Sequence, residues 1–301
     1  MKSHTLRQSG ILLLAAVIWG MAFVSQMKGM DYMGPLTFNG VRSFIGTMVL
    51  CLYLLISRNC THTKPQPIPW RIALPGGLVC GAALTLATTL QQYGISYTTV
   101  GKSGFITTLY ILFVPILGIF IKRKIRNIVW VAAALAVVGM YLLCMEQDVI
   151  SINMGDVLTF FCAIVFAVHI LVIDHYSPKV DGAVLSAIQF LVCGVICTTG
   201  AFFTEQPSWA QLQEGVWPLL YAGVMCCGVA YTLQIVGQKG LNPTIAALVM
   251  SLEAVVAAVA GFFAYRIGIL QQDQTLTVRQ MLGCAIVFGA VILVQLPTKS
   301  R

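Results

Sequence analysis

Ten stretches of roughly twenty mostly apolar residues follow one another along the chain, separated only by short polar or charged links. A helix that crosses the hydrocarbon core of a bilayer needs about 20 apolar residues, so ten of them use nearly all of the 301 residues. The composition, 58% hydrophobic and 9% charged, lies far outside that of a water-soluble domain. The sequence therefore predicts an all-α integral membrane protein with ten transmembrane helices and no separate soluble domain. The predicted spans are residues 10–26, 36–57, 72–92, 101–121, 128–145, 157–173, 183–203, 217–236, 244–265 and 281–296.

The placement of lysine and arginine predicts the orientation in the membrane. In short loops these residues are retained on the cytoplasmic side. With the N-terminus in the cytoplasm, that side receives thirteen of them and the opposite side only four, so both termini are predicted to be cytoplasmic. The net charge of +8 is thus a signal of topology. It does not indicate nucleic-acid binding, because the basic residues are scattered over separate links with no aromatic residues between them.

Two parts of the chain repeat each other weakly. A shift of 147 residues places residues 15–23 on 162–170, and a shift of 139 places 109–115 on 248–254. The predicted domains are two five-helix repeats, residues 1–147 and 153–298. Because five is an odd number, the second repeat enters the membrane from the opposite side, and inverted repeats are typical of secondary transporters. The alternative is that any two apolar helices align to some degree.

Several short motifs resemble one family. The first span contains Trp19-Gly20-Met21-Ala22-Phe23-Val24, and the third and fourth spans contain the block from Gln91 to Tyr110, followed by Phe113-Val114-Pro115. Together with Arg42 and Leu252-Glu253, these motifs resemble the EamA-like family of the drug/metabolite transporter superfamily over the whole chain. Two departures leave the substrate subclass open. Ala254 stands where the family commonly has proline after the glutamate, and basic residues replace an acidic ending of the fourth and ninth spans.

The resemblance implies a transporter of a small organic metabolite, such as an amino acid, an amine or a related solute. It implies an exporter of the bacterial plasma (inner) membrane that works by alternating access. A central cavity would be lined by helices one, three, four, six, eight and nine. The alternatives are a flippase for lipids or lipid-linked sugars of the same superfamily and, from another class, a non-transporting membrane scaffold or enzyme.

Two charged residues inside the predicted spans are the first candidates for the site, because an ionisable group in hydrocarbon is costly and normally faces a cavity or a partner. Glu253 lies about ten residues, or roughly 15 Å, into the ninth span, near the bilayer midplane. It is a candidate to accept a proton or to bind an amine, and the alternative is a neutral structural acid that hydrogen-bonds a neighbouring helix. Arg42 either snorkels to the outer headgroups or is a gate or coupling residue that binds an anionic group or a helix end.

His169 in the sixth span can relay protons near neutral pH, or it is a neutral histidine held by packing. The other candidates are aromatic or neutral polar side chains, which suit a small zwitterionic or amphipathic solute. For Tyr93 and Tyr97 the alternative is the interfacial aromatic belt, and for Trp19 it is packing. The substrate-cavity candidates are Trp19, Gln91, Gln92, Tyr93, Tyr97, Thr107, Thr108, Tyr110, His169, Tyr231, Gln234 and Glu253.

Motifs for catalysis, metals or nucleotides are not found. The four histidines form no His-Glu-x-x-His, and neither a Gly-x-Ser-x-Gly nor a P-loop sequence occurs. We therefore expect no enzyme activity, no catalytic residue, no cofactor and no metal. The expected partners are a solute, the lipid bilayer and a proton as the candidate coupling ion, while the oligomeric state is open.

Overall fold

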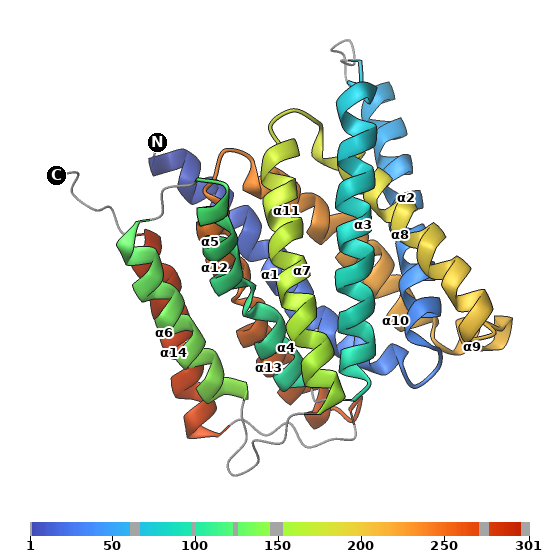
Figure 1. Cartoon of the computed structure of the whole chain (residues 1–301). Helices are drawn as coiled ribbons and strands as arrows, with labels where there is room; N and C mark the ends of the chain where they lie inside the picture. The colour runs from blue at the N-terminus through green and yellow to red at the C-terminus, as the bar shows by residue number, and fades with distance from the viewer. Residues whose placement is uncertain are drawn as a thin grey trace.

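The computed structural model describes residues 2–60, 67–97, 100–122, 126–144, 153–270 and 277–295, and over these residues the chain is helical with no strand. The helices pack into one bundle (Figure 1). They are α1 (Lys2–Gly29), α2 (Pro35–Cys60), α3 (Trp70–Ile95), α4 (Val100–Thr108), α5 (Tyr110–Phe120), α6 (Asn127–Cys144), α7 (Met154–Tyr176), α8 (Gly182–Thr204), α9 (Trp209–Glu214), α10 (Val216–Leu220), the π-helix η1 (Tyr221–Ala230), α11 (Tyr231–Gln238), α12 (Pro243–Met250), α13 (Glu253–Arg266) and α14 (Val278–Gln295).

Eight of the predicted spans coincide with helical segments that are long and apolar enough to cross a membrane. The fifth and tenth predicted spans fall on α6 and α14. Their apolar parts, Asn127–Gly139 and Val278–Leu293, are shorter than a full span within the described residues. A multi-pass membrane protein is therefore the observed fold, whereas the count of ten crossings stays a prediction.

The two predicted repeats are interleaved. The most extensive packing joins helices from different repeats, with α2 against α8, α3 against α7 and α8, α6 against α14, and α1 against α13. In Figure 1 the α6 and α14 pair lies at one edge of the bundle, and α2 and α8 lie at the other. A space at the centre is thus enclosed by helices of both repeats.

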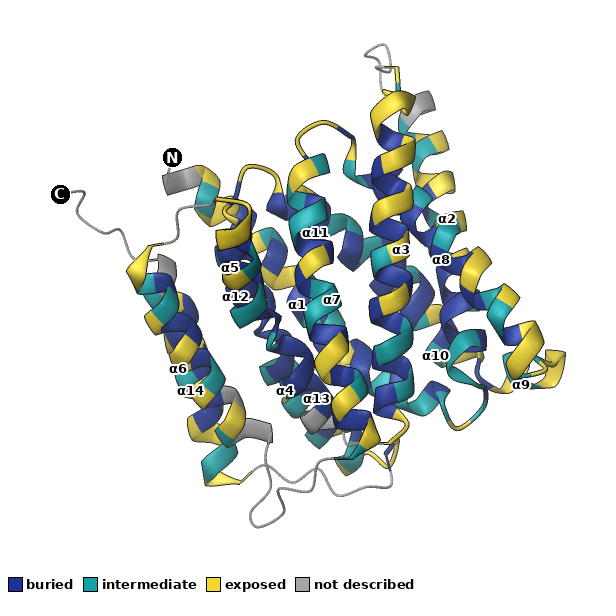
Figure 2. Ribbon diagram, in the orientation of Figure 1, coloured by how far each residue is buried: buried dark blue, intermediate teal, exposed yellow. Residues whose placement is uncertain are grey.

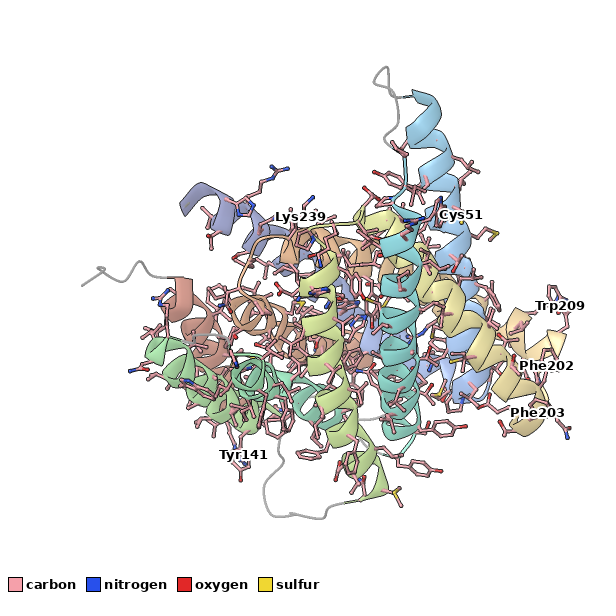
Figure 3. All side chains as sticks on the ribbon, turned by 45° about the horizontal axis from the view of Figure 1, so that its top comes forward. Cys51, Tyr141, Phe202, Phe203, Trp209 and Lys239 are labelled. Atoms are coloured by element: carbon pink, nitrogen blue, oxygen red, sulfur yellow. The ribbon has the colours of Figure 1, made fainter. Side chains whose placement is uncertain are left out.

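The outer surface is apolar. Buried residues follow the inner faces of the helices, and exposed residues follow the outer ones (Figure 2). Phe202 and Phe203 at the end of α8 and Trp209 on α9 project outward (Figure 3), and Phe203 is 84% exposed. A surface covered by large apolar side chains suits contact with lipid rather than with water.

The described ends of the chain lie together. Helix α1 begins and α14 ends at the same end of the bundle, the upper end in Figure 1, and the described ends of α2, α5 and α11 are also there. Arg7, Lys122 and Lys239 belong to these helix ends. These three basic residues, which the sequence assigns to one side, thus lie at one end of the bundle.

Two predicted spans are interrupted near their middles. In the fourth span, α4 and α5 are separated at Leu109, whose N–H donates to the Ile106 carbonyl three residues back. In the ninth span, α12 and α13 are separated at Ser251 and Leu252, and the N–H of Leu252 donates to the Val249 carbonyl. These tightened turns replace the regular α-helical bond.

The interruption of the ninth span occurs without the proline that the family commonly has there. The Ser251 hydroxyl donates to the Leu248 carbonyl at 2.8 Å. Bonds from serine hydroxyls to backbone carbonyls of the preceding turn are a known cause of local helix distortion. The eighth span is irregular in another way, because η1 is a π-helix of ten residues, a rare form that is frequent at functional sites.

Candidate functional site

A cavity lies at the centre of the bundle between helices of both repeats. The space between its walls, including its opening to solvent, is about 500 Å³, but the centres of water molecules can occupy only about 40 Å³ of it. That is small beside the roughly 300–1,000 Å³ of typical ligand pockets. Helices one, three, four, six, eight and nine of the predicted spans all contribute to the wall, and the second contributes Arg42. The lining residues are Trp19, Phe23, Gln26, Arg42, Gln91, Thr107, Tyr110, Phe166, Ile170, Cys226, Tyr231, Gln234, Met250 and Glu253.

Glu253 is the one acid among these lining residues and is 6% exposed. Its position follows from the interruption of the ninth span, because it is the first residue of α13. The Tyr110 hydroxyl donates to Glu253 Oε1 at 3.0 Å, and Tyr110 is the first residue of α5, directly after the other interruption. No described residue donates to Glu253 Oε2 or forms an ion pair with the carboxylate. One carboxylate oxygen is therefore held in place, and the other can receive a proton or a donor group of a solute.

Gly20 on α1 determines how closely α1 packs against α13 next to Glu253. A Cβ atom on Gly20 would lie 2.7 Å from Val256 Cγ1 and 2.8 Å from the Glu253 carbonyl oxygen, closer than a side-chain carbon can come. Glycine therefore allows α1 and α13 to pack backbone to backbone. The neighbouring Trp19 is thereby placed on the cavity wall, where its ring packs edge-on against Tyr231 with the ring centres 4.8 Å apart.

Arg42 lies on α2 and lines the same cavity, although it is only 4% exposed. Its guanidinium carbon is 5.4 Å from the centre of the Phe38 ring. No described residue forms an ion pair or a hydrogen bond with it. Snorkelling to the headgroups is therefore not the arrangement found, since the side chain turns into the protein.

The neutral polar groups of the wall are partly paired with each other. The Gln91 side chain donates to Thr107 Oγ1 at 3.3 Å, which links α3 to α4. By contrast, Trp19 Nε1, Gln26 Oε1 and Gln234 Oε1 are buried without a hydrogen-bond partner among the described residues. Buried polar atoms of this kind normally have partners, so three residues of the wall have polar atoms without a partner among the described residues.

Five of the sequence-predicted candidates lie outside the lining set. Gln92 donates to the Gln26 carbonyl at 3.2 Å and so joins α3 to α1. Thr108 donates to carbonyls of its own helix. Tyr93 donates to Glu205 at 3.3 Å near the end of α8, and Tyr97 is 61% exposed. His169 is fully buried behind the wall.

The surroundings of His169 are those of a packed side chain. Its Nε2 is 3.1 Å from Gln189 Oε1 on α8, and its ring lies against Tyr231 and Phe166, with centres 6.2 and 6.4 Å away. Tyr231 and Phe166 line the cavity. His169 therefore packs behind two lining residues and does not line the cavity itself.

Six lining residues were not among the sequence-predicted candidates: Phe23, Gln26, Phe166, Ile170, Cys226 and Met250. Helical spacing contained a signal for some of them. Phe23 and Gln26 follow Trp19 by four and seven residues, which places all three on one face of α1. The spacing by itself does not say which face of a membrane helix meets the cavity rather than lipid.

Comparison with known proteins agrees with this architecture. The model of the EamA-like transporter family matches residues 8–145 and, separately, residues 153–296. An Archaeoglobus fulgidus protein named an uncharacterized transporter is 31% identical over 95% of this chain and 84% of its own length. Bacillus subtilis YwfM, also named an uncharacterized transporter, is 27% identical over 96% of this chain and 94% of its own length. A solved crystal structure with a TM-score of 0.75 and 15% identity covers 95% of this chain and 97% of its own, and this likeness concerns the fold alone. The chain belongs to the EamA-like transporter family.

Proposed function

We propose that this protein is a secondary transporter that exports a small organic solute, such as an amino acid, an amine or a related compound, across the bacterial plasma membrane. The observation that carries the proposal is the central cavity, which is enclosed by both parts of the chain and contains a buried carboxylate. Membership of a transporter family supports the activity class. The direction rests on the resemblance of the sequence motifs to exporters of the family.

Glu253 is the proposed coupling residue. An ionised carboxylate without a counter-ion is costly in a buried site, and no described cation lies within 4.0 Å of it. A proton or the ammonium group of a solute, bound at Oε2, would relieve that cost. The two cannot occupy one oxygen together, so their competition would couple the movement of solute to that of protons. The Tyr110 hydrogen bond keeps the carboxylate directed at the cavity.

Alternating access is proposed because the cavity is too narrow for such a solute in the conformation described. The accessible space of about 40 Å³ is far below the roughly 300–1,000 Å³ of typical ligand pockets, so side chains or helices must move before an amino acid can bind. The interruptions at Leu109 and at Ser251–Leu252 adjoin the lining residues Thr107, Tyr110, Met250 and Glu253. Turns of this kind are frequent hinge points, and broken helices at the binding site are typical of secondary transporters.

The proposed membrane arrangement is ten crossings in two inverted repeats, residues 1–147 and 153–298. The end of the bundle where α1 begins and α14 ends would face the cytoplasm, because the basic links gather there. The family model matches the chain twice in succession, over ranges close to these repeats.

A lipid flippase would need the cavity to open sideways to the bilayer. An apolar groove does lie on the surface between α3, α5 and α7, lined by residues such as Val79, Phe120 and Val172. It shares no lining residue with the central cavity. We therefore favour transport of a solute between the two aqueous sides.

The test is flux through the purified protein in liposomes, with a panel of labelled amino acids, amines and nucleosides and a proton gradient in either direction. We expect at least one compound to move faster than in protein-free liposomes, at a rate that depends on pH. Glu253→Gln should abolish the pH dependence while the protein stays folded by gel filtration and circular dichroism. Glu214→Gln, the same chemical change on the exposed helix α9, should behave as wild type.

The absence of flux for the whole panel under both gradients would contradict the transporter proposal. Flux with the same pH dependence in Glu253→Gln as in wild type would remove Glu253 from the coupling step and leave the carrier activity in place.

A further inference from the structure

The guanidinium of Arg42 is a buried positive charge without a partner among the described residues. The side chain is 96% buried, lines the central cavity, and has no described residue within ion-pair or hydrogen-bond distance. The Phe38 ring, whose centre is 5.4 Å from the guanidinium carbon, faces it. An aromatic ring is neither a hydrogen-bond acceptor of the usual strength nor an anion that would neutralise an arginine.

Arginine stays protonated in proteins, so this charge cannot be removed by losing a proton. Burying an unpaired charge costs far more than burying an apolar group. The ring of Phe38 offsets only a small part of that cost, since such cation–π contacts contribute about 0.5–2 kcal/mol. The site is therefore incomplete, and what completes it is an anion that enters the cavity.

Glu253 does not complete it. Both charges line the cavity, but the arginine and the carboxylate are more than 4.0 Å apart, because no ion pair between these described residues is formed. Glu253 has its own partner, the Tyr110 hydroxyl. Opposite charges that line one cavity without touching can each bind a different group of one solute once the cavity has widened.

From this geometry we infer that Arg42 is the anion-binding subsite of the cavity and takes the carboxylate group of the transported solute. The inference rests on the proposed function and adds to it the class of solute. Planar guanidinium groups bind carboxylates through two parallel N–H···O bonds. A carboxylate would thus supply both the missing charge and the missing acceptors.

The rest of the wall fits the body of such a solute. Trp19 Nε1 is a further donor without a partner. Phe23, Phe166 and Tyr231 add aromatic side chains to the wall. We infer that the preferred solutes are carboxylic acids with an apolar or aromatic body, and that a positively charged group on the same molecule meets Glu253.

The first experiment compares four probes with the same hydrocarbon body: phenylalanine, its methyl ester, phenethylamine and 3-phenylpropionate. Their dissociation constants for the purified wild-type protein are measured by calorimetry in chloride-free buffer. We expect the two acids to bind roughly 10- to 100-fold more tightly than the ester and the amine, which is the range for charge-assisted hydrogen bonds. Wild-type protein that binds the ester and the amine as tightly as the acids would overturn the inference.

The second experiment changes the arginine. Arg42→Gln should remove the preference for acids, while the affinities for ester and amine stay within about twofold of wild type. Arg42→Lys should keep part of the preference, because lysine retains the charge without the planar pair of donors. The matched control is Arg71→Gln on the exposed start of α3, which should bind all four probes as wild type. If Arg42→Gln does not fold, the inference is tested by the affinities of the four probes for wild type and for Arg42→Lys. A preference for acids that is equally strong in both proteins would then contradict it.

The competing explanation is that an inorganic anion, rather than the carboxylate of the solute, pairs with Arg42. Adding chloride would then stabilise wild type and Arg42→Lys, but not Arg42→Gln, against heat, and acids and esters would bind alike. That outcome would overturn the assignment to the solute. An unchanged ratio of acid to ester affinity in Arg42→Gln would overturn it as well. Either result leaves the proposed function intact if flux of these probes through wild type still depends on Glu253. The proposed function itself is contradicted only if no compound of the whole flux panel moves.

Discussion

Glu205→Ala is expected to destabilise the folded protein by about 2–3 kcal/mol. Glu205 follows the last residue of α8, and its carboxylate caps the start of α2. Oε1 accepts the Leu36 N–H, and Oε2 accepts both the N–H and the hydroxyl of Thr37, each at 2.8 Å. The Tyr93 hydroxyl donates to Oε1 at 3.3 Å. One half-exposed side chain thus joins α8 to α2 and α3.

The magnitude follows from these contacts. Losing a side-chain cap at a helix N-terminus costs about 1 kcal/mol, and losing a negative charge there costs about 0.5 kcal/mol. The two hydroxyl donors add about 0.5 kcal/mol each, because the site is partly exposed to solvent. The sum is near 2.5 kcal/mol, and stability should fall by that amount.

The assay is equilibrium unfolding in mixed micelles, followed by circular dichroism. Glu214→Ala is the matched control, since Glu214 is exposed on α9 and has no hydrogen bond to a described residue. Thr37→Val should cost about 0.5–1 kcal/mol, and it should cost almost nothing in the Glu205→Ala background, because the shared bond is already lost. Surface changes usually alter stability by no more than about 0.5 kcal/mol. If Glu205→Ala and Glu214→Ala agree within about 0.5 kcal/mol, Glu205 does not stabilise the start of α2.

Two further changes test the walls of the cavity. Gly20→Ala should lower stability by about 1–3 kcal/mol, because its methyl group collides with Val256; a melting temperature equal to that of wild type would refute the close packing of α1 on α13. Tyr110→Phe should slow solute flux, because it removes the hydroxyl that holds Glu253, whereas Thr108→Val, outside the cavity, should leave flux unchanged. Equal flux in both variants would show that the Tyr110 bond is not used.

Hydropathy was sufficient to place most of the helices, because a bilayer imposes length and apolarity on each crossing. The predicted span 36–57 and the observed helix Pro35–Cys60 differ only at their ends. Each of the predicted spans 101–121 and 244–265 corresponds to two helices in the structure. Their interruptions depend on hydrogen bonds such as that from Ser251 to Leu248, and hydropathy does not report these bonds.

The site was predicted in part, for a similar reason. Glu253 and Arg42 are costly in hydrocarbon wherever they point, so the sequence marks both as candidates, and both line the cavity. Neutral side chains have no such signature. Thr107 lines the cavity while the adjacent Thr108 bonds to its own helix, and only the rotation of α4 against its neighbours distinguishes them.

The central claim is that solute and proton compete for one carboxylate in the cavity, and simultaneous recording of both fluxes tests it most directly. Liposomes that contain the protein and a lumenal pH dye are loaded with a labelled solute that the flux panel identifies, and its release is started by dilution. For wild type we predict that solute release is matched by proton movement in the opposite direction, and that Glu253→Gln releases solute with no pH change. Proton movement that continues in Glu253→Gln, or solute release from wild type without any pH change, would contradict the account.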